Sequence, residues 1–204
     1  MRRGAGKAVA LTSFVAAEGK STISFQLAAS LAQAGKRVLL LDADLRKSSL
    51  LNRFRVKTKV EGLCHYLSGM ANINDLLYET DVPNMYVMFA GSYVPNAAEL
   101  LSGPSFGKMI TALKNVFDYV IVDSAPLGQV IDCAVIAPTL DGVLMVIDST
   151  NNSYKMERRV KAQVEKAGGR VLGVVLNRVD TKDRGGYYGR LYSKMDDLDS
   201  DNNG

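Results

Sequence analysis

The segment SFVAAEGKST, residues 13–22, contains the residue types that bind phosphate. It follows the apolar run Val9-Ala10-Leu11 and precedes a stretch, Ile23 to Ala34, whose composition predicts a helix. Backbone N–H groups at a helix N-terminus lack partners, a glycine lets the chain close round an anion, and a lysine adds a positive charge. The ending G-K-S-T therefore predicts a phosphate-binding loop of the Walker type.

The match to a phosphate loop is incomplete. Phe14 stands where such loops usually carry a glycine, and Ala16 and Ala17 replace residues that are often glycine or proline. Taken alone, the segment also fits an ordinary strand-to-helix turn capped by serine or threonine. If the loop requires a positive φ at position 17, Ala17 is strained by about 1 kcal/mol, which predicts weakened nucleotide binding.

Three aspartates stand at the ends of two apolar runs. Asp42 and Asp44 end the run in RVLLLDADLRK, and Asp123 ends that in FDYVIVDSAP. Alternate residues of an extended segment point the same way, so we expect Asp42 and Asp44 to face one pocket. Carboxylates and the hydroxyl of Ser21 are the hard oxygen ligands that Mg²⁺ needs when it bridges phosphates. Each aspartate alone could cap a helix, but three of them beside a Walker-like loop favour a magnesium site.

The elements that position these residues follow an α/β pattern. Short aliphatic runs alternate with helix-length amphipathic segments, which predicts a mostly parallel sheet with helices on both faces and ligands at the carboxyl ends of its strands. Residues 182–204 replace aliphatic side chains with Gly, Tyr, Asp and Asn, so we expect a catalytic domain over residues 1–181 and a flexible tail over 182–204. The expected strands are Val9 to Thr12, Arg37 to Leu41, Met85 to Phe89, Tyr119 to Val122, Val143 to Ile147 and Val171 to Leu176.

The composition is that of one soluble domain. The chain has 204 residues, 47% of them hydrophobic and 23% charged, and neither a membrane-length apolar run nor a signal sequence, so we expect it to be cytosolic. Cys64, Cys133 and the single histidine, His65, cannot build a disulfide framework or a four-ligand zinc site. We interpret both cysteines as reduced packing residues, because the adjacent Cys64-His65 pair rarely allows a nucleophile and base to face each other.

Five ordered segments, EGKST, LLLDADLRK, VPNAAELL, FDYVIVDSAP and GVVLN, resemble the bacterial tyrosine kinases (BY-kinases) of capsule and exopolysaccharide assembly. The resemblance implies a P-loop NTPase-like fold related to the deviant-Walker ATPases. Those ATPases carry a signature lysine where this chain has Val15, which favours the kinase over a nucleotide-switched localisation ATPase. Ala16 and Ala17 stand where the family usually has Pro-Gly. This departure leaves a third alternative, a non-catalytic nucleotide-binding scaffold.

The resemblance also assigns roles to individual residues. ATP and Mg²⁺ are the implied cofactors, with Asp42 orienting or deprotonating the attacking hydroxyl, Asn177 at the adenine, and Arg46 at phosphate or the incoming tyrosine segment. Lys20, Asp42, Asp44 and Asp123 are the implied catalytic residues, and Ser21, Asp44 and Asp123 organise the metal. The implied nucleotide-binding residues are Ala16, Ala17, Glu18, Gly19, Lys20, Ser21, Thr22, Arg46 and Asn177.

Three tyrosines of the tail, Tyr187, Tyr188 and Tyr192, stand among the glycines of RGGYYGRLY. They resemble the cluster that BY-kinases phosphorylate on themselves, although a strand fragment or a docking segment would also explain them.

The implied partners are a membrane-embedded polysaccharide co-polymerase that activates the kinase, further copies assembled in a ring, and a cognate tyrosine phosphatase. The implied location is the inner face of the cell membrane. The chain lacks the family's ring-forming E-x-x-R-x-x-R pattern, which indicates a trimmed domain or an unusual member that is mainly monomeric in dilute solution.

The segment from Arg46 to Lys59 carries six basic residues and no acidic one. Such a run is usually a solvated face, but it could also attract acidic partners or anionic lipid headgroups to the active-site side. The formal net charge of +4 would permit nucleic-acid binding. The basic run contains one aromatic residue, Phe54, and no DNA-reading motif appears, so we expect no nucleic-acid partner.

Overall fold

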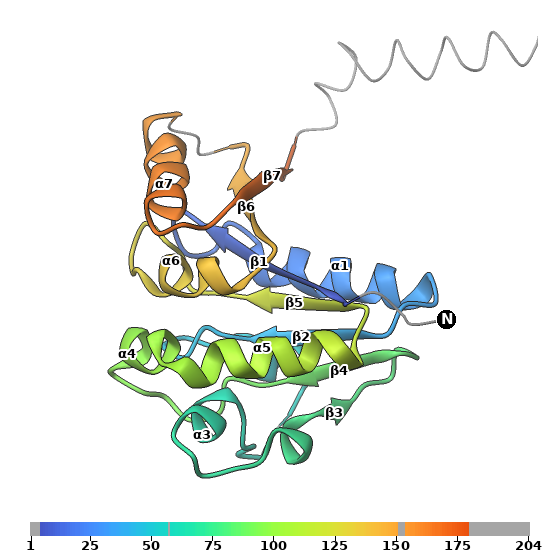
Figure 1. Cartoon of the computed structure of the whole chain (residues 1–204). Coiled ribbons are helices and arrows are strands. Elements are labelled where there is room, and N and C mark those ends of the chain that lie inside the picture. Colours follow the sequence, from blue (N-terminus) through green and yellow to red (C-terminus); the bar gives the residue numbers. More distant parts are fainter. Residues whose placement is uncertain (1–4, 57, 151–153, 180–204) are drawn as a thin grey trace, which may run out of the picture.

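The computed structural model describes residues 5–56, 58–150 and 154–179, with side chains from residue 157 onward in the last range. Within these ranges a seven-stranded sheet has the order β3-β4-β2-β5-β1-β6-β7, and all neighbours are parallel except β3 and β4 (Figure 1). The strands are β1 (Lys7–Ser13), β2 (Val38–Asp42), β3 (Tyr78–Glu79), β4 (Met85–Met88), β5 (Tyr119–Asp123), β6 (Gly142–Asp148) and β7 (Val171–Asn177).

Helices cover both faces of the sheet, as the sequence predicts (Figure 1). Helix α1 packs on one face, and α4 to α7 lie on the other. The helices are α1 (Lys20–Gln33), α2 (Leu50–Arg53), α3 (Leu63–Leu67), α4 (Ala97–Ser102), α5 (Pro104–Val116), α6 (Asp132–Ile136) and α7 (Tyr154–Lys166), with 3₁₀ turns η1 (Ile73–Leu76) and η2 (Ala137–Thr139).

The central strand β2 shows why both layers are needed. Its whole sequence, VLLLD, is buried. Val38 and Leu40 pack with the α1 side, whereas Leu39 and Leu41 pack with the α5 side. Alternation along a strand sends successive side chains to opposite faces, so an uninterrupted apolar strand requires cover on both.

Helix α1 lies close to the sheet because its inner face is small. Ser24, Ala28 and Ala32 recur every four residues and are buried, so one narrow stripe contacts the strands. The helix ends where Gly35 takes a φ of 77° and donates its N–H to the Ala32 carbonyl. At the other end, Lys20 and Ser24 contact Asp123, which holds the start of α1 against the carboxyl end of β5.

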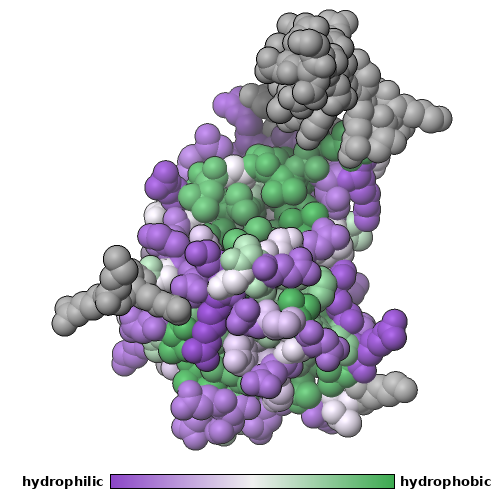
Figure 2. Space-filling model, turned by 90° about the vertical axis from the view of Figure 1, so that its right-hand side faces the viewer, coloured by the Kyte–Doolittle hydropathy of each residue, from purple (hydrophilic) through white to green (hydrophobic). Residues whose placement is uncertain are grey.

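The sheet ends in a partly uncovered edge strand. Leu172, Val174 and Leu176 of β7 are all exposed. Figure 2 shows a continuous hydrophobic area in the upper part of the molecule, where β6 and β7 lie in Figure 1. None of the described helices is both long enough and apolar enough to span a membrane.

Candidate active site

The predicted phosphate loop joins β1 to α1 and has the backbone of an anion cradle. Ala17 and Gly19 both adopt a positive φ, 67° and 91°. The first intrahelical bond of α1 runs from the Ile23 N–H to the Gly19 carbonyl, so the N–H groups before it have no intrahelical acceptor. This arrangement suits phosphate oxygens, and it places the non-glycine residue Ala17 in the left-handed conformation that the sequence analysis considered.

Gly19 adopts a positive φ and also lies close to the side chain of Asn177. A Cβ at this position would lie 2.1 Å from Nδ2 of Asn177. Asn177, at the end of β7, donates from Nδ2 to the Glu18 carbonyl at 2.9 Å. The side chain assigned to adenine by resemblance therefore contacts the backbone of the phosphate loop in this structure.

The lysine of the loop reaches the acid at the end of β5. Lys20 Nζ lies 2.8 Å from Asp123 Oδ1, and both side chains are almost fully buried. The same Nζ donates to the Ser21 hydroxyl at 3.4 Å, and Ser24 Oγ donates to Asp123 Oδ1 at 3.1 Å. Lys20 and Asp123, which are 103 positions apart in the sequence, thus form a buried ion pair beneath the loop.

Asp42 is paired with Asp123 across the β2–β5 ladder. Its side chain is completely buried, and it accepts hydrogen bonds from the Asp44 N–H and the Ser48 hydroxyl. Burial, and secondly the charge of Asp123, raise the pKa of Asp42 from 3.8 to about 8, although the two hydrogen bonds and Lys20 oppose the rise. Asp42 thus binds a proton much more tightly than an ordinary aspartate.

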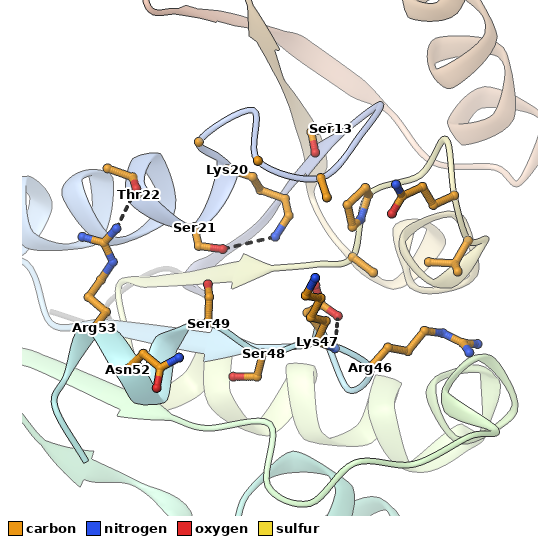
Figure 3. A pocket seen from close by; sticks show the side chains of 18 of the residues that line it. Ser13, Lys20, Ser21, Thr22, Arg46, Lys47, Ser48, Ser49, Asn52 and Arg53 are labelled. Carbon is orange, nitrogen blue, oxygen red and sulfur yellow. Dashed lines mark hydrogen bonds between the residues drawn. The ribbon is translucent and has the colours of Figure 1, made fainter. Parts of the chain in front are cut away.

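A pocket of about 600 Å³ opens above these groups (Figure 3). Asp44 lines the pocket, whereas Asp42 lies behind the wall, so only one of the two aspartates expected to face the pocket does so directly. Ser48, which is hydrogen-bonded to Asp42, also lines it. The lining residues from the predicted set are Ala16, Ala17, Gly19, Lys20, Ser21, Thr22, Asp44 and Arg46.

The guanidinium of Arg46 is held by a buried acid. Its Nε donates to Asp132 Oδ2 at 2.9 Å, and one terminal nitrogen donates to the Pro95 carbonyl at 3.3 Å. The hydrogen bond with Asp132 raises the pKa of Arg46 above its ordinary value. Arg46 therefore borders the pocket while its charge is neutralised by α6, a pairing across 86 residues that the sequence analysis missed.

The comparisons with known proteins identify the family. A family model described as an AAA domain matches residues 6–167. Tyrosine-protein kinase CpsD of Streptococcus agalactiae is 43% identical over 174 residues, which make up 85% of this chain and 76% of CpsD. This chain belongs to the bacterial tyrosine-protein kinases. The kinase domain of the Escherichia coli tyrosine kinase ETK has a TM-score of 0.82 at 30% identity, with 86% of this chain and 69% of that chain covered.

A longer relative of this tyrosine kinase is similar over the same region. The succinoglycan biosynthesis transport protein ExoP of Rhizobium meliloti is 33% identical over 184 residues, which are 89% of this chain but 23% of ExoP. The similarity to this chain therefore covers only one part of ExoP. The fold of this kinase, a P-loop ATPase-type parallel sheet, is the one that the sequence predicts.

The phosphate loop of this kinase is fastened by a group of residues that we name the loop clamp: Glu18, Asp148, Asn177 and Arg178. The Glu18 carboxylate accepts the N–H groups of Phe14 and Val15 at 2.8 and 2.9 Å. Arg178 pairs with Asp148 and donates to the Ala17 carbonyl at 2.8 Å. Glu18, predicted to bind nucleotide, thus bonds the loop's own backbone, while Asp148 and Arg178 were missed because no local pattern marks a contact across 161 residues.

The two cysteines of this kinase are buried, and one of them contacts the neighbouring histidine. Cys64 and Cys133 are buried free thiols, and burial raises the pKa of each, which keeps them protonated. Nδ1 of His65 accepts the Gly62 N–H at 3.1 Å and so caps α3. Cys133 fits the packing role predicted from the sequence. Sγ of Cys64, however, lies 3.3 Å from Nδ1 of His65, so the adjacent pair does come into contact, contrary to the expectation. The predicted acceptors Tyr187, Tyr188 and Tyr192 lie outside the described residues.

Proposed function

We propose that this tyrosine kinase uses ATP and Mg²⁺ to phosphorylate other copies of the same chain. The acceptors are Tyr187, Tyr188 and Tyr192 in the tail, residues 182–204. One observation carries the proposal. Lys20, the first residue of α1, is ion-paired at 2.8 Å with the buried Asp123, beside a pocket that Ser21 and Asp44 line. A cation, a hydroxyl and carboxylates at one end of the sheet are the groups that phosphoryl transfer requires.

The donor set fits magnesium held jointly with phosphate. No cluster of three or more His, Cys, Asp or Glu side chains among the described residues could hold a metal by itself. Ser21, Asp44 and Asp123 would supply hard oxygen ligands, directly or through water, and phosphate oxygens would complete the shell, as is common for Mg²⁺. When bound, ATP supplies the phosphoryl group and its metal offsets charge; Lys20 and the loop N–H groups hold the phosphates in place.

Ser48 and Asp42 provide a route for the proton of the attacking tyrosine. As the tyrosine oxygen bonds to the γ-phosphorus and the bond from that phosphorus to the departing ADP breaks, the tyrosine proton would pass to Ser48 Oγ and the Ser48 proton to Asp42. A reference tyrosine has a pKa near 10, so a carboxylate with a pKa of about 8 is a better matched acceptor than an ordinary aspartate. It accepts the proton in its ionised form, whose share rises as the pH approaches 8. Ser48 is suited to this relay because it lines the pocket and already donates to Asp42.

The name of ExoP supports a role in polysaccharide assembly. In our proposal the kinase regulates polymerisation and export of a capsular or extracellular polysaccharide at the inner face of the membrane. A membrane-embedded co-polymerase activates it, ring assembly brings tails to neighbouring pockets, and a tyrosine phosphatase reverses the modification.

Incubation of the chain with Mg-ATP, followed by mapping of phosphate by mass spectrometry, tests the proposal. We expect phosphotyrosine at residues 187, 188 and 192, and a loss of at least about a hundredfold in Lys20→Met. The exposed Lys36→Met is the matched control and should retain the signal. Free phosphate without phosphotyrosine would instead indicate a switch ATPase, and bound nucleotide without either product would indicate a scaffold.

A further inference from the structure

The pocket carries positive charge that its surroundings do not neutralise. Lys47 and Arg53 line the pocket, are exposed, and make no ion pair with any residue in the described ranges. We call these two side chains the basic rim. The neighbouring Arg46 differs, because Asp132 neutralises it.

Arg53 is fixed close to the phosphate loop. It donates to Thr22 Oγ1 at 2.6 Å, and its guanidinium lies 5.4 Å from the centre of the Phe25 ring. Thr22 is two residues beyond Lys20 in the first turn of α1. In Figure 3, Arg53 lies to one side of Lys20 and Ser21, and Lys47 lies to the other. The rim therefore flanks the place where phosphate would be transferred.

The sequence of the tail complements this charge. Residues 195–204 contain Asp196, Asp197, Asp199 and Asp201 and neither lysine nor arginine. Asp196 follows Tyr192 by four residues, which span at most about 14 Å when extended. A tyrosine held near Lys20 would consequently bring these aspartates within reach of the rim.

We propose that the basic rim binds the aspartate-rich segment, residues 196–201, of a second copy of this chain and so selects that tail as substrate. This inference rests on the proposed function of the same pocket. A lipid surface would engage bases spread over a broad face, whereas Lys47 and Arg53 line a hollow that also contains Lys20. Charge complementarity of this kind improves encounter and orientation and weakens with salt.

Binding of labelled tail peptides to the whole chain tests the proposal. One peptide carries residues 185–204, and a second carries Asn at the four aspartate positions. We expect the second peptide to bind at least about tenfold more weakly at low salt, and Lys47→Glu/Arg53→Glu to weaken binding of the first by a similar factor. The control Lys36→Glu/Lys59→Glu changes two exposed lysines that do not line the pocket, giving the same net charge change. It should retain the discrimination.

Equal binding of the two peptides to the unaltered chain overturns the proposal, as does equal weakening by the rim and control variants. Vesicles of phosphatidylserine and phosphatidylcholine distinguish the lipid alternative. Loss of vesicle binding in the rim variant, together with equal binding of the peptides, would assign the rim to a membrane and overturn the proposal. The peptide titration needs no phosphoryl transfer, so an absence of phosphotyrosine counts against the proposed function and leaves this test intact.

Discussion

Asp42 and Ser48 show how a fully buried carboxylate can act on a group in a pocket. Asp42 is inaccessible, but Ser48 both donates to it and lines the pocket. We predict that Ser48→Ala lowers kcat for tyrosine phosphorylation by about tenfold or more with little change in KM, because the relay is lost while substrate contacts remain. Ser49→Ala, which alters another hydroxyl of the pocket lining, is the control. Equal kcat values for the two variants, measured by initial rates, would remove Ser48 from the mechanism.

The raised pKa of Asp42 also predicts how stability depends on pH. Between about pH 4 and pH 8 the folded state holds a proton on Asp42 that the unfolded chain has released, so stability falls as pH rises through this window. The slope from this group is at most about 1.4 kcal/mol per pH unit. Urea unfolding of the chain and of Asp42→Asn in metal-free buffer at pH 5 to 8 measures it. As the pH rises, the free energy of unfolding of Asp42→Asn should increase relative to that of the unaltered chain. Parallel curves of the two free energies against pH would contradict a raised pKa at Asp42.

The strain at Ala17 gives opposite predictions for two neighbouring alanines. Ala17 has a φ of 67°, whereas Ala16 is not among the residues with a positive φ. Ala17→Gly should therefore raise the free energy of unfolding by up to about 1 kcal/mol and tighten nucleotide binding, since glycine adopts this conformation without strain. Ala16→Gly should lower the free energy of unfolding by about 0.5–1 kcal/mol, because glycine raises the entropy of the unfolded state. Thermal unfolding would decide, and a shift of the same sign in both variants would argue against strain at Ala17.

At the scale of elements, the loop clamp connects the phosphate loop to the ends of β6 and β7. Glu18→Ala removes a carboxylate that accepts two backbone N–H groups of the loop. We predict nucleotide affinity about tenfold lower or more, because charge-assisted bonds that hold the cradle are lost while the sheet is unaffected. Glu165→Ala, which breaks an exposed pair with Lys161, is the control. Titration with a fluorescent nucleotide measures both, and unchanged affinity in Glu18→Ala would show that the clamp does not shape the loop.

The elements also show what could be predicted from sequence. Aliphatic runs located the strands that became β1, β2, β4, β5 and β6, because a strand buried on both faces must be apolar throughout. A similar run located β7, although one face of that edge strand is exposed. The strand β3 was missed, since two residues, Tyr78–Glu79, are too short to show a period. The acids at strand ends were identified because parallel strands bring their carboxyl ends together. The partners of Arg46 and Ala17 could not be predicted, because those contacts depend on how distant loops pack.

At the scale of the whole molecule, the charged pocket and the exposed apolar side chains belong to different parts of the sheet. The charged pocket lies over the central strands β1, β2 and β5, while the exposed apolar side chains belong to the edge strand β7. The catalytic groups come from segments in the first two thirds of the chain, and the proposed acceptor tyrosines come from its end. Transfer between copies requires only that the tail of one chain reach the pocket of another, which is the arrangement that we propose.

A mixing experiment tests the central claim most directly. A chain with Lys20→Met and an intact tail is incubated with Mg-ATP and an active chain whose Tyr187, Tyr188 and Tyr192 are phenylalanine, and phosphate on each is mapped by mass spectrometry. We predict phosphotyrosine at these three positions of the Lys20→Met chain, at a rate that rises with the concentration of the active chain. A Lys20→Met chain that stays unmodified, while the unaltered chain labels itself independently of concentration, would contradict transfer between copies through this pocket.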